Sequence, residues 1–327
     1  MILVVDLDAV CRCVGHDLLS FHGMLGIWSA SCVGTRRKEG HVIIDFRGRP
    51  STPEFGTYFI PSRLEWIAKR VGARGVSEAY LNASLVMFLD EMEEAGVTLT
   101  VAVGRNSPEV TIGGRTFPVG IIPNDHLVDL QTAHPDRIVG IAGVDASNTL
   151  HNAVEEIERY VGDGPLKGVF VEPQRAMEAH VDDERLDPIY EKCLELDVPV
   201  VIMSGPLAGE NIALTDPAHV DSLASRFPDL NIVCGHGCYP YVTEIVAVAL
   251  KHQNVYVSPD LYTFTPGAEP YIDVANSFMA DQFLFATAYP IRPLKEMVED
   301  FMSLPLSDEV RDKALFGNAM RLLKMEH

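Results

Sequence analysis

Short runs of apolar residues recur along most of the chain, separated by longer stretches of helical character. Eight runs have the length and composition of buried strands, at residues 41–46, 97–104, 137–144, 167–172, 198–203, 230–235, 255–258 and 282–287. Strands that are apolar on both faces are typical of a parallel sheet covered by helices. The pattern therefore predicts an α/β protein.

Two of the intervening stretches carry clear helix boundaries. Residues 77–96 predict a helix that is closed by Gly96, since glycine commonly follows the last helical residue. Residues 187–197 predict a second helix, with Asp187 as its N-cap and Pro188 at the first helical position. Helices of this kind would cover the faces of the sheet.

Eight β-then-α units in one chain predict a (β/α)8 TIM barrel, which we place as a single domain over residues 41–327. A doubly wound sheet is the alternative. Residues 1–40 lack the pattern and carry clustered cysteine, histidine and glycine with a basic stretch at 35–40, so we expect an N-terminal appendage. A start codon assigned too far upstream would leave the same kind of segment.

The chain is strongly acidic. Its 26 Lys and Arg against 46 Asp and Glu give a formal charge of -20, which repels phosphate backbones and anionic membranes. With 47% hydrophobic and 22% charged residues, the composition is that of a globular protein. We therefore expect neither nucleic acid nor a membrane as a partner.

The sequence also favours a cytoplasmic protein. Six cysteines in 327 residues do not form a dense disulfide framework. The first residues carry Asp6 and Asp8 where a signal peptide needs positive charge. No segment reaches the roughly 18 apolar residues of a membrane span.

The first predicted strand ends in an arginine pair, within HVIIDFRGRP at residues 41–50. Because side chains alternate along a strand, Asp45, Arg47 and Arg49 should project to the same side. In a TIM barrel the chemistry lies at the carboxyl ends of the strands. In so acidic a chain, the pair is aimed either at an anionic ligand or at a structural carboxylate such as Asp45 or Glu172.

Five ordered segments carry a family resemblance: IDFRGRP (44–50), LDPIYEKCLELDVPVVIMSGP (186–206), FPDLNIVCGHG (227–237), FLFATAYP (283–290) and LFGNAMRLL (315–323). Their order and spacing resemble the amidohydrolase superfamily, in the amidohydrolase-related branch that includes aminocarboxymuconate semialdehyde decarboxylase and similar carboxy-lyases and hydrolases. The resemblance covers residues 41–327 and implies a TIM barrel. It also implies a homodimer or a larger homo-oligomer.

The resemblance further implies a divalent metal, held by two histidines after the first strand, one after the fifth, often one after the sixth, and an aspartate after the eighth. Only His236 keeps a ligand here, and the other matching positions hold Arg47, Arg49, Met203 and Ala288. Arginine stays protonated and has no lone pair for a metal, while methionine is a weak ligand. We therefore expect no metal and no other cofactor, and an arginine pair that binds a small anionic substrate directly.

His236 and Asp260 are the candidate catalytic residues. His236 follows an apolar strand between two glycines, and a neutral imidazole near two guanidinium groups is a plausible general base. Asp260 follows the next strand and is the acid placed to assist it. A relocated metal site that uses Cys234, His236 and Cys238 is a rival, although alternate strand residues lie about 6–7 Å apart and rarely converge on one ion.

Further candidates follow other strands. We expect Glu172, Tyr262, Tyr289 and Arg292 to bind substrate, because loops at the carboxyl ends of the strands line the site of a barrel. Arg175, close behind Glu172, and the group Asn124, Asp125 and His126 could also reach the pocket. Each has an ordinary structural explanation as a helix cap, an ion pair, a packing aromatic or a solvated loop residue.

These observations favour a hydrolase that acts on a small carboxylate-bearing substrate without the usual metal. Arg47 and Arg49 would bind the anion, and His236, assisted by Asp260, would act as the base. The resemblance implies a carboxy-lyase as the alternative. A non-catalytic protein that binds an anion on the same fold is the third possibility.

Overall fold

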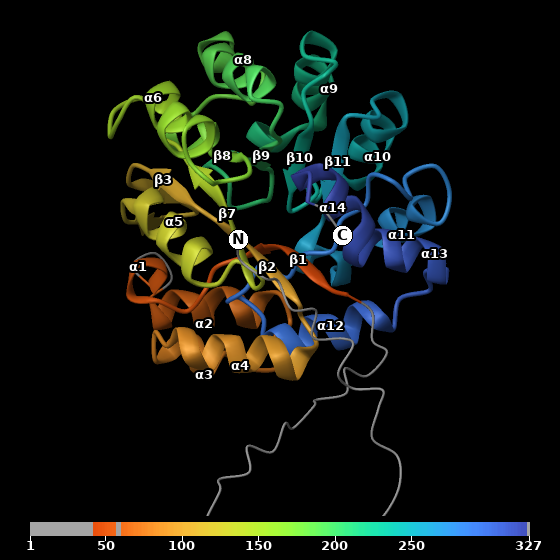
Figure 1. Cartoon of the computed structure of the whole chain (residues 1–327). Coiled ribbons are helices and arrows are strands. Elements are labelled where there is room, and N and C mark those ends of the chain that lie inside the picture. The colour runs from red at the N-terminus through yellow and green to blue at the C-terminus, as the bar shows by residue number, and fades with distance from the viewer. Residues whose placement is uncertain (1–41, 57–59, 326–327) are drawn as a thin grey trace, which may run out of the picture. The chain divides into compact units, whose positions relative to one another are not determined.

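The computed structural model describes residues 42–56 and 60–325 of the 327-residue chain. They fall within one compact unit, Gly40–His327. The predicted appendage at residues 1–40 lies outside the described residues. Within the unit, helices surround a ring of strands (Figure 1).

Seven parallel strands form one curved sheet, in the order β1-β2-β7-β8-β9-β10-β11. They are β1 (Ile44–Gly48), β2 (Leu99–Val103), β7 (Ile138–Gly143), β8 (Val169–Val171), β9 (Val200–Met203), β10 (Ile232–Gly235) and β11 (Val255–Ser258). Strands that pair in the sheet are also consecutive among the strands predicted for the barrel, and a crossover connection joins each parallel pair. Each strand falls within or overlaps a segment that the sequence predicts.

The eighth predicted segment, residues 282–287, closes the ring although it is too irregular to count as a strand. Val257 donates its N–H to the carbonyl of Gln282 at 2.8 Å, and Leu284 donates its N–H to the carbonyl of Val257 at 3.0 Å. On the other side, Phe46 donates its N–H to the carbonyl of Phe285 at 3.0 Å. These bonds join the two edges of the sheet and confirm the predicted TIM-barrel fold.

Helices cover the outside of the strands. They are α1 (Pro53–Gly56), α2 (Pro61–Arg70), α3 (Glu78–Leu81), α4 (Leu85–Ala95), α5 (Asn124–Ala133), α6 (Ala153–Ile157), α7 (Pro173–Ala176), α8 (Asp187–Glu195), α9 (Pro217–Arg226), α10 (Val242–Lys251), α11 (Glu269–Ala275), α12 (Leu294–Met302), α13 (Asp308–Asp312) and α14 (Asn318–Leu323). No helix among the described residues is long and apolar enough to span a bilayer.

The helix predicted over residues 77–96 is two helices, α3 and α4, separated by residues 82–84, and its predicted end at Gly96 is confirmed. Gly96 follows α4 with φ 75°, in the left-handed region that glycine adopts more easily than residues with a side chain. Asp187 is not the cap of α8 but its first residue, because a short 3-10 turn precedes it. That turn is capped by Asp183, which accepts the N–H of Arg185.

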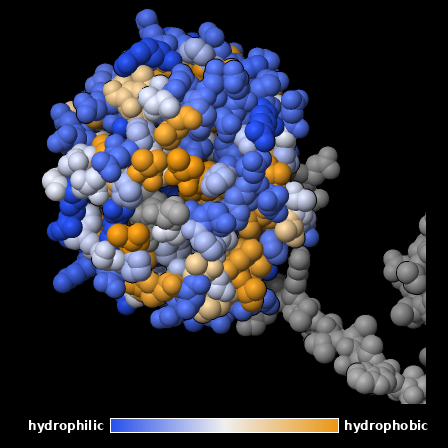
Figure 2. Space-filling model, turned by 90° about the vertical axis from the view of Figure 1, so that its left-hand side faces the viewer, coloured by the Kyte–Doolittle hydropathy of each residue, from blue (hydrophilic) through white to orange (hydrophobic). Residues whose placement is uncertain are grey.

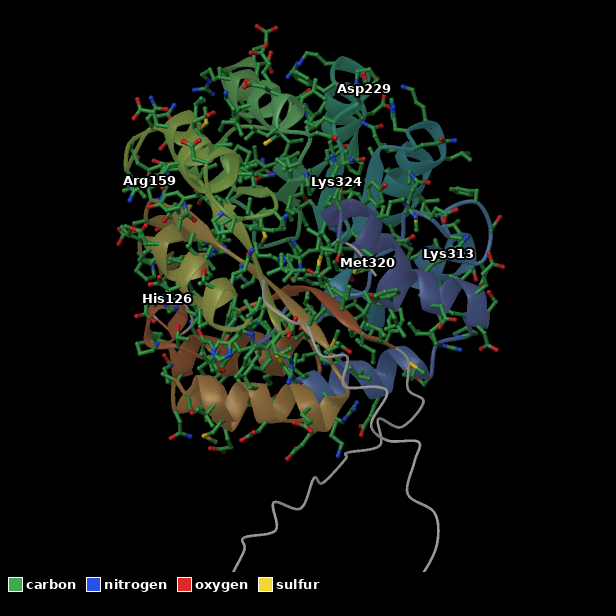
Figure 3. The ribbon with its side chains drawn as sticks, in the orientation of Figure 1. His126, Arg159, Asp229, Lys313, Met320 and Lys324 are labelled. Carbon is green, nitrogen blue, oxygen red and sulfur yellow. The ribbon has the colours of Figure 1, made fainter. Side chains whose placement is uncertain are left out.

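The inside of the barrel is filled by apolar side chains from alternate strand positions, with α14 at one end. Figures 1 and 3 show α14, which carries Met320, in front of the strands. Met320, Ala319 and Leu323 pack into the same cluster as the inward-facing Val101 and Val233. The filled interior leaves the opposite end, where the strands finish, for a binding site.

Two small antiparallel sheets interrupt the barrel pattern after β2, and the sequence did not predict them. One pairs β3 (Arg105–Ser107) with β6 (Gly120–Ile122), and the other pairs β4 (Val110–Ile112) with β5 (Arg115–Phe117). They bring Arg105 and Phe117 to the carboxyl end of the barrel. Figure 2 shows a face of the molecule on which hydrophobic residues form small groups within a mostly hydrophilic surface.

Candidate functional site

A cavity at the carboxyl ends of the strands collects four arginines. It encloses about 390 Å³ of space between atoms, including its open mouth. The lining residues are Arg47, Arg49, Ile67, Arg105, Phe117, Arg175, Met203, Leu207, His236, Tyr262 and Ile291. The arginine pair predicted from the first strand, His236 and Tyr262 therefore meet in one cavity.

A β-bulge in β1 explains how both arginines face the cavity. The pairing of β1 with β2 shifts between Asp45 and Gly48, so β1 carries one extra residue there. The bulge moves Arg47 and Arg49 to the inner face and leaves Asp45 on the outer one. The expectation that all three project to the same side is therefore wrong for Asp45.

Asp45 joins the two edges of the barrel instead of pairing with the arginine side chains. Its carboxylate accepts the N–H of Thr287 at 2.8 Å, the hydroxyl of Thr287 at 2.7 Å and the N–H of Arg47 at 3.1 Å. Complete burial raises the pKa of Asp45 to about 6, against the lowering effect of these hydrogen bonds. Asp45 therefore has a structural role where the two edges of the sheet meet.

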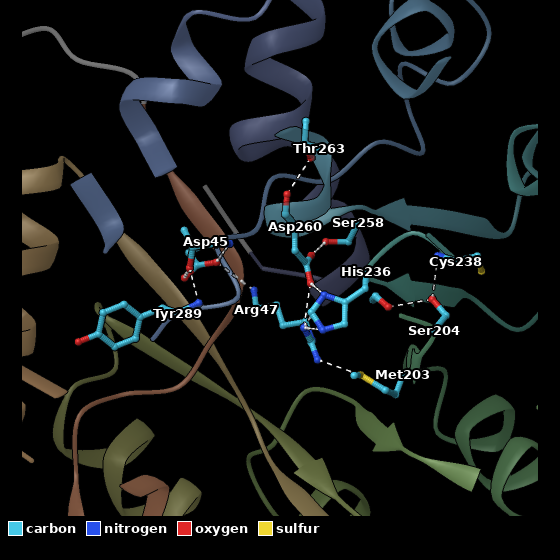
Figure 4. Close-up of polar contacts among 12 residues, drawn as sticks. Asp45, Arg47, Met203, Ser204, His236, Cys238, Ser258, Asp260, Thr263 and Tyr289 are labelled. Carbon is cyan, nitrogen blue, oxygen red and sulfur yellow. Dashed lines mark hydrogen bonds and ion pairs between the residues drawn. The ribbon is translucent and has the colours of Figure 1, made fainter. Parts of the chain in front are cut away.

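Arg47 lies among the ends of β9, β10 and β11 (Figure 4). Its Nη1 donates to Asp260 Oδ2 at 2.8 Å and to His236 Nε2 at 2.8 Å, and its Nη2 donates to Met203 Sδ at 3.3 Å. Its side chain is 1% exposed. A guanidinium group therefore stands at the point where these three strand ends converge.

These contacts favour one tautomer of His236. Arginine only donates hydrogen bonds, and Arg47 Nη1 lies nearer to Nε2, at 2.8 Å, than to Nδ1, at 3.2 Å. We therefore assign Nε2 as the acceptor and place the proton on Nδ1, which lies 2.9 Å from Asp260 Oδ2. Burial and the charge of Arg47 lower the pKa of His236 to about 4. The ring is therefore neutral near pH 7, and its free lone pair already faces Arg47.

Asp260 is the charged partner in this group. Burial alone would raise its pKa, but the charge of Arg47 and the hydrogen bond from His236 hold the pKa below its usual range. Ser258 donates a further hydrogen bond to Oδ1 at 2.6 Å. Asp260 and His236 both adopt left-handed backbone conformations, with φ of 55° and 72°, and such strain tends to cluster at functional sites.

Glu172 organises the other half of the cavity. Its Oε1 lies 2.7 Å from Arg105 Nη2 and 3.3 Å from Arg175 Nε. Burial raises the pKa of Glu172, but the nearby arginines, Arg105 first, outweigh it and keep the carboxylate charged. Asp260 and Glu172 thus contact three of the four guanidinium groups that line the cavity.

Tyr262 forms an aromatic wall of the cavity. Its ring meets His236 edge-on at a centroid distance of 5.2 Å and stacks on Tyr239 at 5.0 Å. Burial raises the pKa of Tyr262, so its hydroxyl stays protonated. The structure thus places Tyr262 where a ligand would contact it, and its binding role stays a prediction.

The structure does not bring Tyr289 or Arg292 to the cavity. Figure 4 shows the Tyr289 ring pointing away from His236, and its hydroxyl bonds to Ser77 at 2.6 Å. Arg292 donates to Glu296 at 2.6 Å and to Asp300 at 2.5 Å, which ties the segment before α12 to that helix. The structure corrects the expectation that these two side chains reach the site, because a hydrogen bond in the core holds Tyr289 and ion pairs hold Arg292.

The predicted site residues at the start of α5 also lie outside the lining of the cavity. Asn124 bridges to β7 by exchanging two hydrogen bonds of 3.0 Å with the backbone of Gly143. Asp125 is exposed and pairs with Arg159, and Figure 3 places Arg159 and His126 toward the periphery. His126 contacts Thr52 at 2.9 Å. These residues support the fold around the site.

Sequence reasoning missed Arg105 and Phe117 as site residues. Both arrive on the small sheets after β2. The only signal was Gly113-Gly114 between two short β-prone runs, which is typical of a hairpin turn. Arg175, which follows Glu172 by three residues in α7, lines the cavity as the sequence predicted.

The cavity does not fit the divalent metal that the resemblance implies. Arg47 stands within 2.8 Å of both His236 and Asp260, and its fixed positive charge opposes a second cation there. No cluster of three or more His, Cys, Asp or Glu side chains suited to a metal occurs in residues 42–56 and 60–325. Cys234 and Cys238 pack in the outer core, away from the inward-facing His236.

Comparison with known proteins agrees with the fold and the motifs. A family model described as Amidohydrolase matches residues 87–325. An uncharacterized TIM-barrel protein from Bordetella bronchiseptica is 36% identical, with a TM-score of 0.76 over 86% of this chain and 98% of that one.

Named enzymes are more distant. The gamma-resorcylate decarboxylase of a Polaromonas species is 24% identical over 280 residues, which cover 72% of this chain and 85% of that protein. The 5-carboxyvanillate decarboxylase of Novosphingobium aromaticivorans, solved with manganese and a nitrobenzoic acid, is 19% identical. Its TM-score of 0.60 over 88% of this chain and 97% of that one shows a shared fold. The matching family model and the barrel with its strand-end site show that the chain belongs to the amidohydrolase superfamily of enzymes.

Proposed function

We propose that this enzyme is a carboxy-lyase that removes carbon dioxide from a small conjugated carboxylate, and that it works without the usual divalent metal. The similarity to a protein named gamma-resorcylate decarboxylase supports decarboxylation over the hydrolysis expected from the sequence. The observation that carries the proposal is the cavity itself, which four arginines and a neutral histidine line together.

The side chains that line the cavity favour an anionic ligand. Four guanidinium groups lie in its wall, and three of them contact Asp260 or Glu172. Arginine matches the planar geometry of carboxylate and phenolate oxygens and stays charged at any working pH. A substrate with one or two negative oxygens would complete this arrangement.

Decarboxylation breaks one carbon–carbon bond and leaves its electron pair on the substrate. Carbon dioxide departs, the electron pair is delocalised onto a conjugated oxygen, and a proton then binds the carbon. Arginines that gripped only the leaving carboxylate would stabilise the ground state and slow the reaction. We therefore assign Arg47 and Arg49 to the oxygen on which negative charge accumulates.

His236 is placed to move the proton. In the free protein its Nε2 accepts a hydrogen bond from Arg47, and its pKa is about 4. A bound anion would offset the positive charges that lower this pKa, so His236 would take up a proton together with the substrate. Asp260 keeps the ring oriented through Nδ1 during the transfer.

Hydrolysis remains the second candidate because His236 and Asp260 form the pair that activation of water requires. The distance of 2.9 Å between Asp260 Oδ2 and His236 Nδ1 orients Nε2 toward the cavity. Arg47 would have to leave Nε2 before this nitrogen could accept a proton from water. Proton uptake at Nε2 during decarboxylation needs the same release, so the preference for decarboxylation rests on the similarity to the named decarboxylase.

The test is a product assay on aromatic and conjugated carboxylates, run in ¹⁸O-labelled water after exhaustive treatment with a chelator. We expect release of carbon dioxide and no ¹⁸O in the organic product. Arg47→Met should lose at least 99% of turnover. Arg159→Met, which removes an exposed arginine, is the matched control. An organic product that contains ¹⁸O would establish hydrolysis. Turnover that depends on added metal would refute the metal-free site.

A further inference from the structure

A second pocket adjoins the arginine cavity and shares part of its wall. Ile67, Leu207 and Tyr262 line both spaces. The second pocket encloses about 670 Å³ between atoms, including its mouth. Its other lining residues are Trp66, Arg70, Val71, Pro206, Tyr239, Thr265 and Pro266. The two spaces are therefore neighbouring compartments that meet at Tyr262.

The chemistry of the second pocket differs from that of the cavity. Its walls are aromatic and aliphatic, with the stacked pair Tyr239 and Tyr262 inclined by only 10°. Tyr239 is held in place because its hydroxyl donates to the carbonyl of Pro266 at 3.2 Å. Flat, fixed aromatic walls favour another ring or a planar apolar group.

Trp66 adds a polar feature to this apolar pocket. The guanidinium carbons of Arg70 and Arg115 lie 4.3 and 4.5 Å from its ring centre, so the indole is held between α2 and β5. Its Nε1 is buried, and no residue of the described ranges accepts its proton. A buried N–H of this kind costs free energy unless an acceptor is supplied.

We propose that the substrate has two parts, an acidic head in the arginine cavity and a planar apolar arm in the pocket of Trp66 and Tyr239. The inference rests on the proposed function, because it assigns the head to the same cavity. Tyr262 touches both parts at the junction. The arm carries a hydrogen-bond acceptor for Trp66, such as an ether or carbonyl oxygen, so a single-ring acid fills only half of the site.

The experiment compares head-only and two-part probes by titration calorimetry on the full chain. The head probe is benzoate, and the two-part probes are benzoates with a phenyl, benzyl or benzyloxy group at the para position. We expect the best two-part probe to bind at least tenfold more tightly than benzoate, since its second ring leaves water for an apolar pocket. The benzyloxy probe, which has an ether oxygen, should exceed the benzyl one.

Variants assign this gain to the pocket. Trp66→Ala and Tyr239→Ala should each reduce the ratio of two-part to benzoate affinity at least fivefold while benzoate affinity changes less than twofold. Unchanged benzoate affinity also shows that these variants fold. Phe278→Ala, which removes an exposed aromatic outside both pockets, is the matched control and should leave the ratio unchanged.

The outcomes separate this proposal from the proposed function. A ratio near one in the unmodified protein, or a ratio that both pocket variants leave unchanged, would overturn the two-part substrate. If a second copy of the chain covers the pocket, the pocket variants would change the molecular mass and the ratio would stay near one, which also overturns it. If two-part probes bind equally well to Arg47→Met, the pocket stands and the acidic head in the arginine cavity is refuted.

Discussion

At the scale of residues, Arg47 sets the electrostatics of the site. One guanidinium group bonds to the ring of His236 and to the carboxylate of Asp260, and it is almost fully buried. In the positions that the family resemblance assigns to metal ligands, the chain thus carries its own cation. A fixed cation differs from a metal because it cannot be lost and cannot activate water as a Lewis acid.

Replacing Arg47 should restore the basicity of His236. In Arg47→Met we expect the pKa of His236 to rise from about 4 toward its ordinary value, because the positive charge beside the ring is removed. Titration of the imidazole by ¹⁵N NMR measures the shift, with Arg159→Met as the control. A pKa that stays near 4 in Arg47→Met would assign the whole effect to burial.

His236 and Asp45 should act on stability in opposite directions as the pH falls. The pKa of His236 is lowered in the folded state, so acidification from about pH 6.5 to 4 favours unfolding, by up to about 3 kcal/mol. The pKa of Asp45 is raised to about 6, so protonation in the same range favours the folded state. The two contributions largely cancel.

Single variants should expose the two contributions. Urea unfolding at several pH values between 7 and 4.5 should show a steeper loss of stability on acidification in Asp45→Asn than in the unmodified protein. His236→Asn should show a shallower loss. Equal slopes in all three proteins would mean that neither side chain changes its pKa on folding.

At the scale of elements, ion pairs tie α12 to the segment that precedes it and to the segment between α2 and α3. Arg292 is 3% exposed and contacts Glu296 and Asp300, while Arg74, which is 55% exposed, contacts the same Asp300. The two arginines therefore share an acid but differ in burial. This contrast gives a matched pair of substitutions.

Arg292→Met should lower the free energy of unfolding by about 3 kcal/mol, because it leaves Glu296 without its buried partner. Arg74→Met should lower it by less than about 1 kcal/mol, since exposed pairs contribute little. Chemical denaturation measures both. Ligand affinity should be unchanged in Arg292→Met, and a loss of affinity there would return Arg292 to the site.

Most elements could be predicted from the sequence, because buried parallel strands and helix ends leave strong local signals. The eight strand segments and the end of α4 at Gly96 are examples. The site was harder, since a single bulge in β1 reversed the side of Asp45 relative to Arg47. The side chains of Tyr289 and Arg292 leave the site because of partners distant in sequence, which no local pattern shows.

At the scale of the whole molecule, positive charge is concentrated inside an acidic chain. The formal charge is -20, yet four guanidinium groups line the described cavity. An anion that binds there contacts these arginines in the folded state only. Ligand binding should therefore stabilise the fold.

Benzoate at a hundred times its Kd should raise the free energy of unfolding by about 2.7 kcal/mol. Differential scanning calorimetry would record this as a higher Tm. Sodium chloride at the same concentration is the control for ionic strength. The shift should vanish in Arg47→Met, and a shift of equal size in that variant would place the anion elsewhere.

The same contrast between acidic chain and cationic cavity affects how fast a ligand arrives. An anion approaching a chain of formal charge -20 is repelled at a distance and attracted only once it is inside. Salt screens the distant repulsion more than the contacts within the buried cavity. Association should therefore quicken as ionic strength rises, the reverse of the usual behaviour of oppositely charged partners.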